Sequence, residues 1–208
     1  METHEPFDLI RAGAIEPWEQ LNRTLAEQRA VETANPDEAL DAGRLAVEII
    51  RLAVGLDLDS RDMCRRSQAW AMVSAVADAS GKRLLSSAAR RTTLIASSNF
   101  EADGKGNYRF INNRVTIVHP GAGKADFLMT AAKAIEFLIK ELGLEIDWTS
   151  EILEGPLIFS PAVILDAGPD PKRVFESLQI QFFKRDPNGD LLKFDPQNWQ
   201  LELKPTGK

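Results

Sequence analysis

The chain of 208 residues contains one cysteine, Cys64, and two histidines, His4 and His119. A single cysteine excludes a disulfide within the chain, and so few soft ligands leave no basis for a zinc site. A lone thiol is typical of a reducing compartment, where it packs as a small hydrophobic side chain. The sequence therefore predicts no metal and no cofactor.

Long apolar runs are also missing. No stretch approaches the roughly 20 apolar residues that a membrane-spanning helix needs. The N-terminal stretch METHEPFDLIR lacks the basic start of a signal peptide. These absences predict a cytoplasmic protein without membrane association. Hydrophobic residues make up 44% of the chain, which disfavours disorder and is ordinary for a globular protein.

The net charge of −6 is unevenly distributed. From Arg61 to Arg91, seven basic residues accompany two acidic ones, so this window carries +5 and the remainder −11. Basic residues gathered on one segment can bind RNA phosphates or an acidic protein. The residues that we single out for such contacts are Arg65, Arg66, Arg90 and Arg91. Alternatively, they lie on solvated helix faces and pair with acidic segments elsewhere in the chain.

The first hundred residues have the patterns of helices. Two helices are expected from Phe7 to Ile15 and from Pro17 to about Thr33. The third begins with Asn35 as its N-cap and Pro36 in its first turn. The fourth runs from an N-cap at Ser60 to a stop at Gly81, and the fifth from Lys82 to Ser97. In the third of these, Leu40, Val47, Ile50 and Val54 recur at helical spacing, which predicts the face that meets the core.

A further helix, from Lys124 to Leu142, has the widest apolar face of the chain and ends at Gly143. We therefore expect it to be the central pillar of the fold.

Strand patterns dominate after Ile146. Pro161 limits PLIFSPAVILDAG to an edge strand or two short strands, and Asp186-Pro187-Asn188-Gly189 predicts a hairpin turn. NWQLEL is expected to be the last strand. The predicted fold class is α+β: a mainly helical bundle over residues 1–145, followed by a small antiparallel β region over residues 146–208. The two parts form one compact unit or two abutting ones.

Known catalytic motifs fail when their spacing is checked. HPGAGK has neither the first glycine nor the hydroxyl residue of a phosphate loop, and DPNGD lacks the glutamate of a calcium loop. No serine occupies a GxSxG turn. The sequence thus offers no clean catalytic constellation.

The segment YRFINNRVTIVHPGAGKAD has two interpretations. Its β-prone runs flank Asn112-Asn113, which suits the turn of a hairpin over residues 107–118. Alternatively, RVTIVHPGAGKADFLMTAAKAIEFLIKEL resembles the motif of the HEPN domains, an arginine, four to six residues and a histidine, followed by a long helix. Paired strands at residues 108–118 would argue against this resemblance, whereas a helix with both side chains in one cleft would support it.

The HEPN resemblance covers about residues 35–142 and implies a helical bundle acting as a metal-independent endoribonuclease. A dimer would bring two motifs around one RNA cleft. His119 would move the proton of the attacking 2′-hydroxyl, and Arg114 would hold the scissile phosphate. The chain departs from the family pattern at Val115, where the family usually has a polar residue directly after the arginine.

Two functions follow from these patterns. The first is a non-catalytic accessory or interaction protein of bacterial or bacteriophage origin, a subunit of a larger assembly that binds a protein partner or forms a homo-oligomer. The alternative is a HEPN-like endoribonuclease or RNA-binding protein that uses the basic window of residues 61–91.

Overall fold

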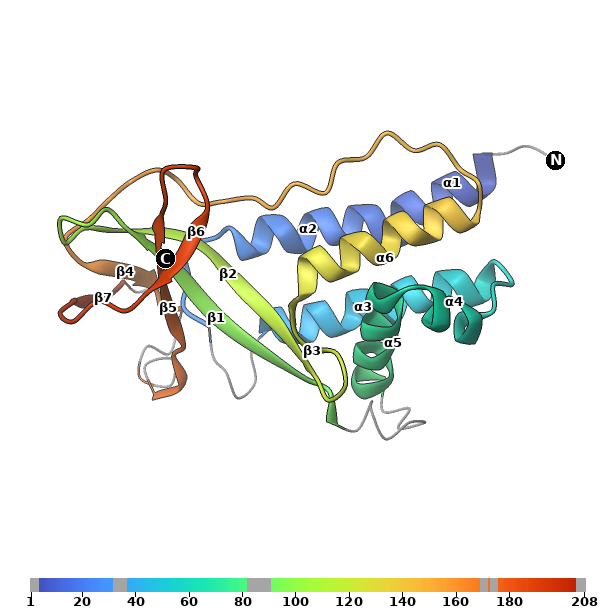
Figure 1. The fold of residues 1–208 in the computed structure, drawn as a ribbon, viewed down its shortest axis with the longest axis horizontal. Coiled ribbons are helices and arrows are strands. Elements are labelled where there is room, and N and C mark those ends of the chain that lie inside the picture. The colour runs from blue at the N-terminus through green and yellow to red at the C-terminus, as the bar shows by residue number, and fades with distance from the viewer. Residues whose placement is uncertain (1–3, 32–36, 82–90, 169–171, 173–175, 205–208) are drawn as a thin grey trace. The chain divides into compact units, whose positions relative to one another are not determined.

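The computed structural model describes residues 4–31, 37–81, 91–168, 172 and 176–204. The helical elements are α1 (His4–Ile10), a π-helical turn η1 (Arg11–Ile15), α2 (Glu16–Leu25), α3 (Asp37–Gly55), α4 (Ser60–Arg66), α5 (Gln68–Ser80) and α6 (Phe127–Glu141), as shown in Figure 1. The strands are β1 (Thr93–Ala102), β2 (Tyr108–His119), β3 (Gly123–Asp126), β4 (Val163–Asp166), β5 (Ile180–Arg185), β6 (Leu191–Phe194) and β7 (Leu201–Lys204).

The strands form a five-stranded sheet in the order β3-β2-β1-β5-β6 and a two-stranded sheet of β4 and β7. The predicted α+β class is confirmed. The prediction of an antiparallel sheet is wrong, because β1 pairs with β5 and β4 with β7 in parallel. The helices are not confined to the N-terminal part either, since α6 follows three strands. Parallel pairs join strands that are distant in sequence, which hairpin patterns do not reveal.

The chain divides into two compact units, each assembled from separated segments. Unit 1 comprises Met1–Asn22, Ala39–Ile95 and Val115–Ile152, and unit 2 comprises Arg23–Glu38, Ala96–Arg114 and Leu153–Lys208. The boundary expected near residue 145 falls inside the last segment of unit 1. The strands β1 and β2 contribute residues to both units.

The first two predicted helices form one continuous run through α1, η1 and α2, which ends at Leu25 rather than near Thr33. The π-helical turn closes where the Glu16 N–H donates to the Arg11 carbonyl oxygen. This turn interrupts the ordinary hydrogen-bond pattern directly before Pro17, which has no N–H to donate. The proline therefore does not break the helix.

The helix α3 buries a different face from the one expected. Leu40 is 48% exposed and Val54 is 63% exposed, so the predicted core stripe is wrong at both ends. The buried residues are Ala42, Leu45, Ala46, Ile49 and Ala53. Alanine-rich faces allow close helix packing, and the spacing of the larger side chains alone pointed to the wrong face. The expected N-cap at Asn35 and Pro36 lies outside the described residues.

The helix predicted from Ser60 to Gly81 is two helices. Ser67 adopts an extended conformation, and its hydroxyl accepts from the Trp70 N–H as the N-cap of α5. Asp59, rather than Ser60, caps α4. The end at Gly81 is confirmed. Of the helix expected from Lys82 to Ser97, residues 82–90 lie outside the described part, and residues 93–97 belong to β1 instead.

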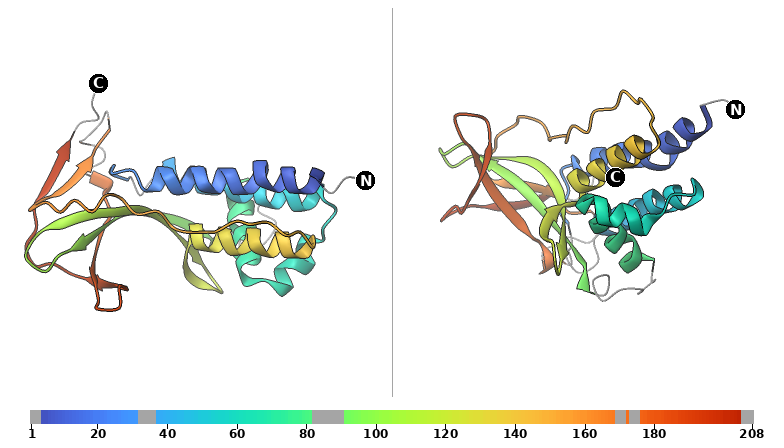
Figure 2. Two further views of the ribbon diagram at one scale, coloured as in Figure 1. Left: turned by 90° about the horizontal axis from the view of Figure 1, so that it is seen from above. Right: turned by 45° about the vertical axis from the view of Figure 1, so that its right-hand side comes forward.

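The helix predicted from Lys124 to Leu142 is α6 in unit 1, but it begins at Phe127, because residues 124–126 belong to β3. The Asp126 carboxylate caps it by accepting from the Met129 N–H, and Gly143, with φ 65°, follows its end. Its buried residues include Phe127, Leu128, Ala131, Ile135 and Leu138. On one side the Trp18 Nε1–H donates to the Leu128 oxygen at 2.9 Å, and on another α5 packs along the helix (Figures 1 and 2).

Unit 2 has its own apolar core on one face of the large sheet. It consists of Phe100, Ala102, Tyr108, Phe110, Val163, Leu165 and Phe182. Leu178 and Ile180 pack against this core. The predicted turn at Asp186 is confirmed, since its carboxylate accepts from the N–H groups of Asn188 and Asp190.

Leu138→Ala tests the role of α6. Leu138 is fully buried, and removing such a side chain typically costs about 2–5 kcal/mol of unfolding free energy because it leaves a cavity. Lys133→Ala, at an exposed position of the same helix, should change the unfolding free energy by less than about 0.5 kcal/mol. Urea unfolding of both variants measures the difference. Equal stability of the two would contradict the central role of α6.

Candidate functional site

Arg114 and His119 both lie on β2, which is a single strand from Tyr108 to His119. The segment is therefore neither the helix of the HEPN interpretation nor a hairpin that turns at Asn112-Asn113. Its turns lie at residues 103–107, between β1 and β2, and at residues 120–122, before β3. Successive strand side chains point to opposite faces, so positions five apart face opposite ways. The strand does not bring Arg114 and His119 together.

His119 has a local role in the turn between β2 and β3. Its Nδ1 accepts from the Gly121 N–H at 3.1 Å and from the Ala122 N–H at 2.9 Å. These bonds place the proton of the neutral imidazole on Nε2. The ring thereby satisfies backbone donors of the turn. This structural role accounts for a histidine at position 119 without a catalytic function.

The basic residues of the window 61–91 are partly paired with acids. Arg65 contacts Asp62 at 3.5 Å, and Arg66 contacts Asp62 at 2.7 Å. Arg91 is exposed before β1, and Arg90 lies outside the described residues. The structure thus brings Arg65 and Arg66 together on α4 with an acidic neighbour. This arrangement agrees with the alternative in which the basic residues lie on solvated helix faces and pair with acids.

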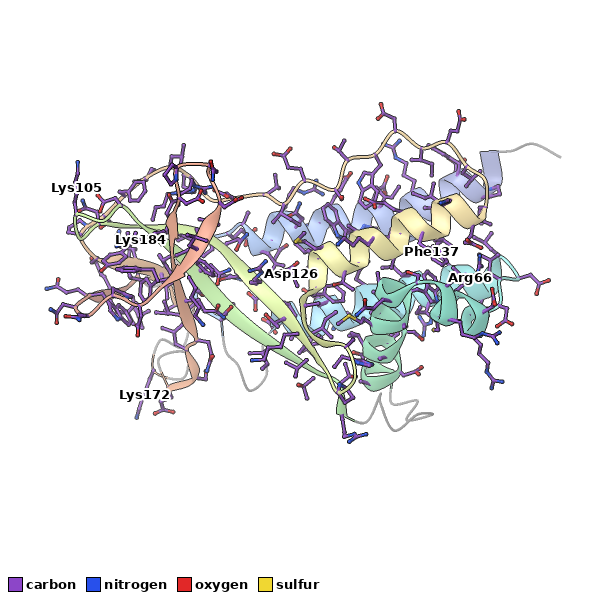
Figure 3. All side chains as sticks on the ribbon, in the orientation of Figure 1. Arg66, Lys105, Asp126, Phe137, Lys172 and Lys184 are labelled. Carbon is purple, nitrogen blue, oxygen red and sulfur yellow. The ribbon has the colours of Figure 1, made fainter. Side chains whose placement is uncertain are left out.

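Arg66 is the most heavily engaged of these cations. Its guanidinium binds both carboxylate oxygens of Glu141 at the end of α6 and lies 5.5 Å from the centre of the Phe137 ring (Figure 3). The hydrogen bonds to Glu141 raise the pKa of Arg66 above its ordinary value. A phosphate would have to compete with this bidentate partner, which weakens the case for nucleic-acid contact here.

Unit 2 contains a charge cluster that the sequence did not predict. Arg109 on β2, whose side chain is 1% exposed, donates from Nε to Glu101 at 2.8 Å and from Nη2 to Glu154 at 2.6 Å. Arg185 on β5 donates to Glu101 at 3.3 Å and to Glu154 at 3.0 Å. Two guanidinium and two carboxylate groups alternate, so the cluster is neutral and each charge has two opposite neighbours.

The cluster shifts the pKa values of Glu154 and Arg185. Burial alone would raise the pKa of Glu154, but hydrogen bonds from Arg109 and Arg185 outweigh it, so the pKa lies below the usual value of 4.5. Hydrogen bonds to Glu101 and Glu154 raise the pKa of Arg185. Every charge is compensated, so the cluster works as a structural clamp and holds no acid or base poised for catalysis.

The clamp fixes an extended segment to β2. Besides Glu154, the Gly155 N–H donates to the Ile111 oxygen at 2.6 Å, and Ser160 exchanges two backbone hydrogen bonds with Tyr108 at 2.8 and 2.9 Å. A Cβ atom at Gly155 would lie 2.9 Å from the Phe110 ring, so only glycine permits this approach. Residues 156–159, between the two anchors, form what we call the display loop.

The display loop exposes large apolar side chains. Leu157 is 79% exposed, Ile158 71% and Phe159 39%. A surface hollow of about 550 Å³ lies beside it, lined by Gln28, Phe110, Pro156, Ile158, Ile164, Asp166 and Lys204. The sequence contains a signal for this site: Leu157, Ile158 and Phe159 are consecutive large apolar residues, which do not show the alternation of a half-buried strand.

Metal chemistry finds no support in the described part of the chain. There, no group of three or more His, Cys, Asp or Glu residues is arranged to hold a metal ion. Burial raises the pKa of the Cys64 thiol, which keeps it in the less reactive protonated form.

Comparison with known proteins does not add to this geometry. No family model, no curated protein and no solved structure matches the chain. Within the described residues, no helix has both the length and the apolar content to span a membrane.

Glu154→Gln tests the clamp through its pH dependence. Because the pKa of Glu154 is lower in the folded state than in the unfolded chain, its ionic contribution to stability is present above about pH 4.5 and is lost as the pH falls through the folded-state pKa. We expect the wild type to lose stability more steeply than the variant below pH 4.5, as measured by urea unfolding from pH 3 to 7.

Glu38 changes the unfolding free energy with pH in the opposite direction in both proteins, because burial raises its pKa despite the ion pair with Arg29. Only the difference between the pH profiles of the wild type and the variant is therefore informative. Identical pH profiles would show that the clamp contributes nothing through Glu154.

Proposed function

We propose that this protein is a non-catalytic interaction subunit that binds a protein partner through its display loop. The observation that supports the proposal most is the exposure of Leu157 and Ile158 on a loop anchored at both ends. Exposed apolar residues are common singly, but a contiguous group of them is typical of a protein interface.

The energetics favour such a role. Burying one leucine or isoleucine side chain contributes roughly 1.5–3 kcal/mol, so Leu157 and Ile158 together can supply much of the energy of a moderate complex. The anchors at Gly155 and Ser160 reduce the entropy that is lost when the loop binds. The same side chains add nothing to the stability of the free chain while they remain in water.

The surroundings of the loop indicate the chemistry of the partner. In the hollow, Phe110, Pro156 and Ile164 provide an apolar lining, while Gln28, Asp166 and Lys204 lie among the polar residues. An apolar centre with a polar rim is the usual anatomy of a protein interface. The partner would present apolar side chains to the hollow and a complementary apolar socket to Leu157.

Site-specific photocrosslinking tests this proposal. A photoreactive residue at position 158 should give a discrete crosslinked product in cells that naturally make the protein. The matched control is position 105, since Lys105 is also exposed in unit 2 and lies in the loop between β1 and β2 (Figure 3). Equal crosslinking at both positions, or none at 158, would overturn the proposal.

The double variant Leu157→Ser, Ile158→Ser distinguishes binding from folding. Because both side chains are exposed, the unfolding free energy of the variant should stay within about 1 kcal/mol of the wild type. Crosslinking from position 159 should fall at least tenfold if the two side chains are the anchors. Sedimentation velocity of both proteins then shows whether the partner is a second copy of this chain.

The HEPN-like ribonuclease remains the alternative hypothesis, and no contact in the described residues favours it. We expect purified protein to leave mixed RNA substrates intact in the presence of EDTA. The reason is that Arg114 and His119 are five positions apart on β2, so their side chains point to opposite faces of the sheet. Cleavage by the wild type that disappears in a folded His119→Ala variant would contradict this expectation and support the alternative. Binding across a salt series would reveal contacts to phosphates, which weaken steeply with salt.

A further inference from the structure

A second site is present in unit 1, where the helical run α1-η1-α2 meets residues 146–148. A cavity of about 310 Å³ lies there, a volume typical of small-molecule sites. Its lining residues are Phe7, Arg11, Ile15, Glu16, Glu19, Ile146, Asp147 and Trp148. We propose that this cavity binds an organic cation, an ammonium or guanidinium group carried on an apolar body.

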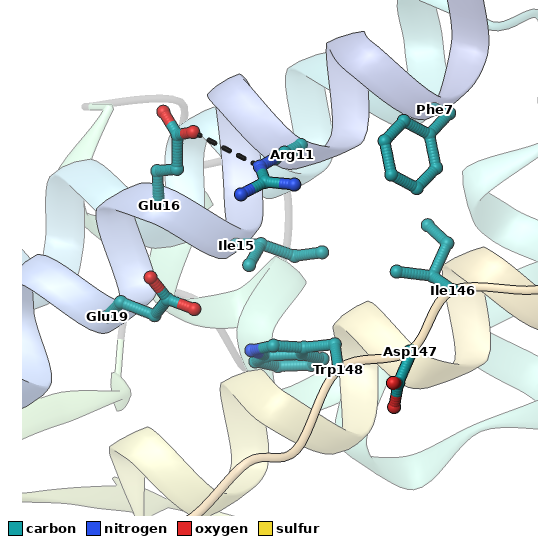
Figure 4. A pocket seen from close by; sticks show the side chains of 8 residues that line it. All are labelled: Phe7, Arg11, Ile15, Glu16, Glu19, Ile146, Asp147 and Trp148. Atoms are coloured by element: carbon teal, nitrogen blue, oxygen red, sulfur yellow. Dashed lines mark hydrogen bonds and ion pairs between the residues drawn. The ribbon is translucent and has the colours of Figure 1, made fainter. Parts of the chain in front are cut away.

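The apolar part of the cavity is preorganised around Trp148. Figure 4 shows the indole ring below the cavity, with the side chains of Phe7, Ile15 and Ile146 around the same space. Trp18 holds the indole by an edge-to-face contact, with ring centres 5.2 Å apart and planes at 89°. An aromatic face held in this way can bind a cation within about 6 Å of its centre.

The segment that carries Trp148 is fixed in place although it has no regular secondary structure. The Asn22 side chain donates to the Glu151 oxygen at 2.8 Å, and the Ser150 hydroxyl donates to Glu136 on α6 at 3.0 Å. The wall of the cavity is therefore built from the same contacts that fix this segment to the helices of unit 1.

The charges at the cavity favour a cation. Arg11 and Glu16 pair with one another at 3.4 Å, so their charges largely cancel. Glu19 and Asp147 have no ion-pair partner among the described residues, so both keep their negative charge at the cavity wall, although Figure 4 shows the Asp147 carboxylate directed away from the Trp148 ring. The net charge of the whole chain is −6, which adds to the attraction for a cation.

The Trp148 indole nitrogen is a further sign of an incomplete site. Its Nε1 is buried and has no hydrogen-bond acceptor. Figure 4 shows this nitrogen on the side of the ring that faces Glu19.

Three probes of similar size and different charge test the proposal. They are 2-phenylethylammonium, neutral 2-phenylethanol and anionic 3-phenylpropionate. With ¹⁵N-labelled tryptophan, the four indole signals report on binding, and Trp148→Phe identifies the signal of Trp148. We expect the cation alone to shift the Trp148 signal saturably, with a Kd of about 1–10 mM, as for a fragment-sized ligand.

Charge variants separate a cation site from a plain apolar hollow. Glu19→Gln should weaken binding of the cation by about two- to fivefold, the range of one partly exposed ion pair, and Asp147→Asn should weaken it less because its carboxylate points away from the cavity. Arg11→Gln should not weaken it. Unchanged signals of Trp70 and Trp199 in these variants would show that both units remain folded. Equal binding of the anion or of the neutral probe, or no saturable shift with the cation, would overturn the proposal.

Discussion

The buried guanidinium of Arg109 is the constraint on which the organisation of unit 2 depends. A full charge that is 1% exposed is tolerated only with compensating partners, and here they come from β1 and from the extended segment, as Glu101 and Glu154. Removing one partner of such a pair typically costs about 3–5 kcal/mol, because the remaining charge stays buried and unpaired. The sheet and the extended segment are thus required to fold together, and Arg185 on β5 extends the requirement to a third strand.

This constraint gives the display loop its form. An unanchored stretch containing Leu157 and Ile158 would lower its free energy by collapsing onto the nearest apolar surface. The hydrogen bonds of Gly155 and Ser160 to β2 leave only four residues between fixed points. Such a short span cannot turn both side chains inward, so they stay in water. The stability supplied by the clamp therefore supports an exposure that is unfavourable for the free protein.

The sequence predicted those features of the fold that depend on interactions between residues close together in the chain. The course of α6, its end at Gly143 and the turn at Asp186 follow from capping and turn chemistry within a few residues. The buried face of α3 depends on how closely alanines let other helices approach, and the parallel pairing of β1 with β5 joins distant segments. Glu101 and Arg109 are equally spaced about the loop at residues 103–107, and cross-strand pairing could have been inferred from that spacing had β1 been recognised as a strand.

Both proposed binding sites include side chains from residues 144–160, a long stretch of the described chain without regular secondary structure. Irregular segments usually serve as connections, but this one is held at Ser150 and Glu151 in unit 1 and at Glu154 and Gly155 in unit 2. Side chains free of the spacing of a helix or strand can point wherever their anchors allow. Trp148 can therefore line a cavity while Leu157, nine residues later, projects into solvent. The helices and sheets supply the anchors, and both proposals assign recognition to the segment that they hold.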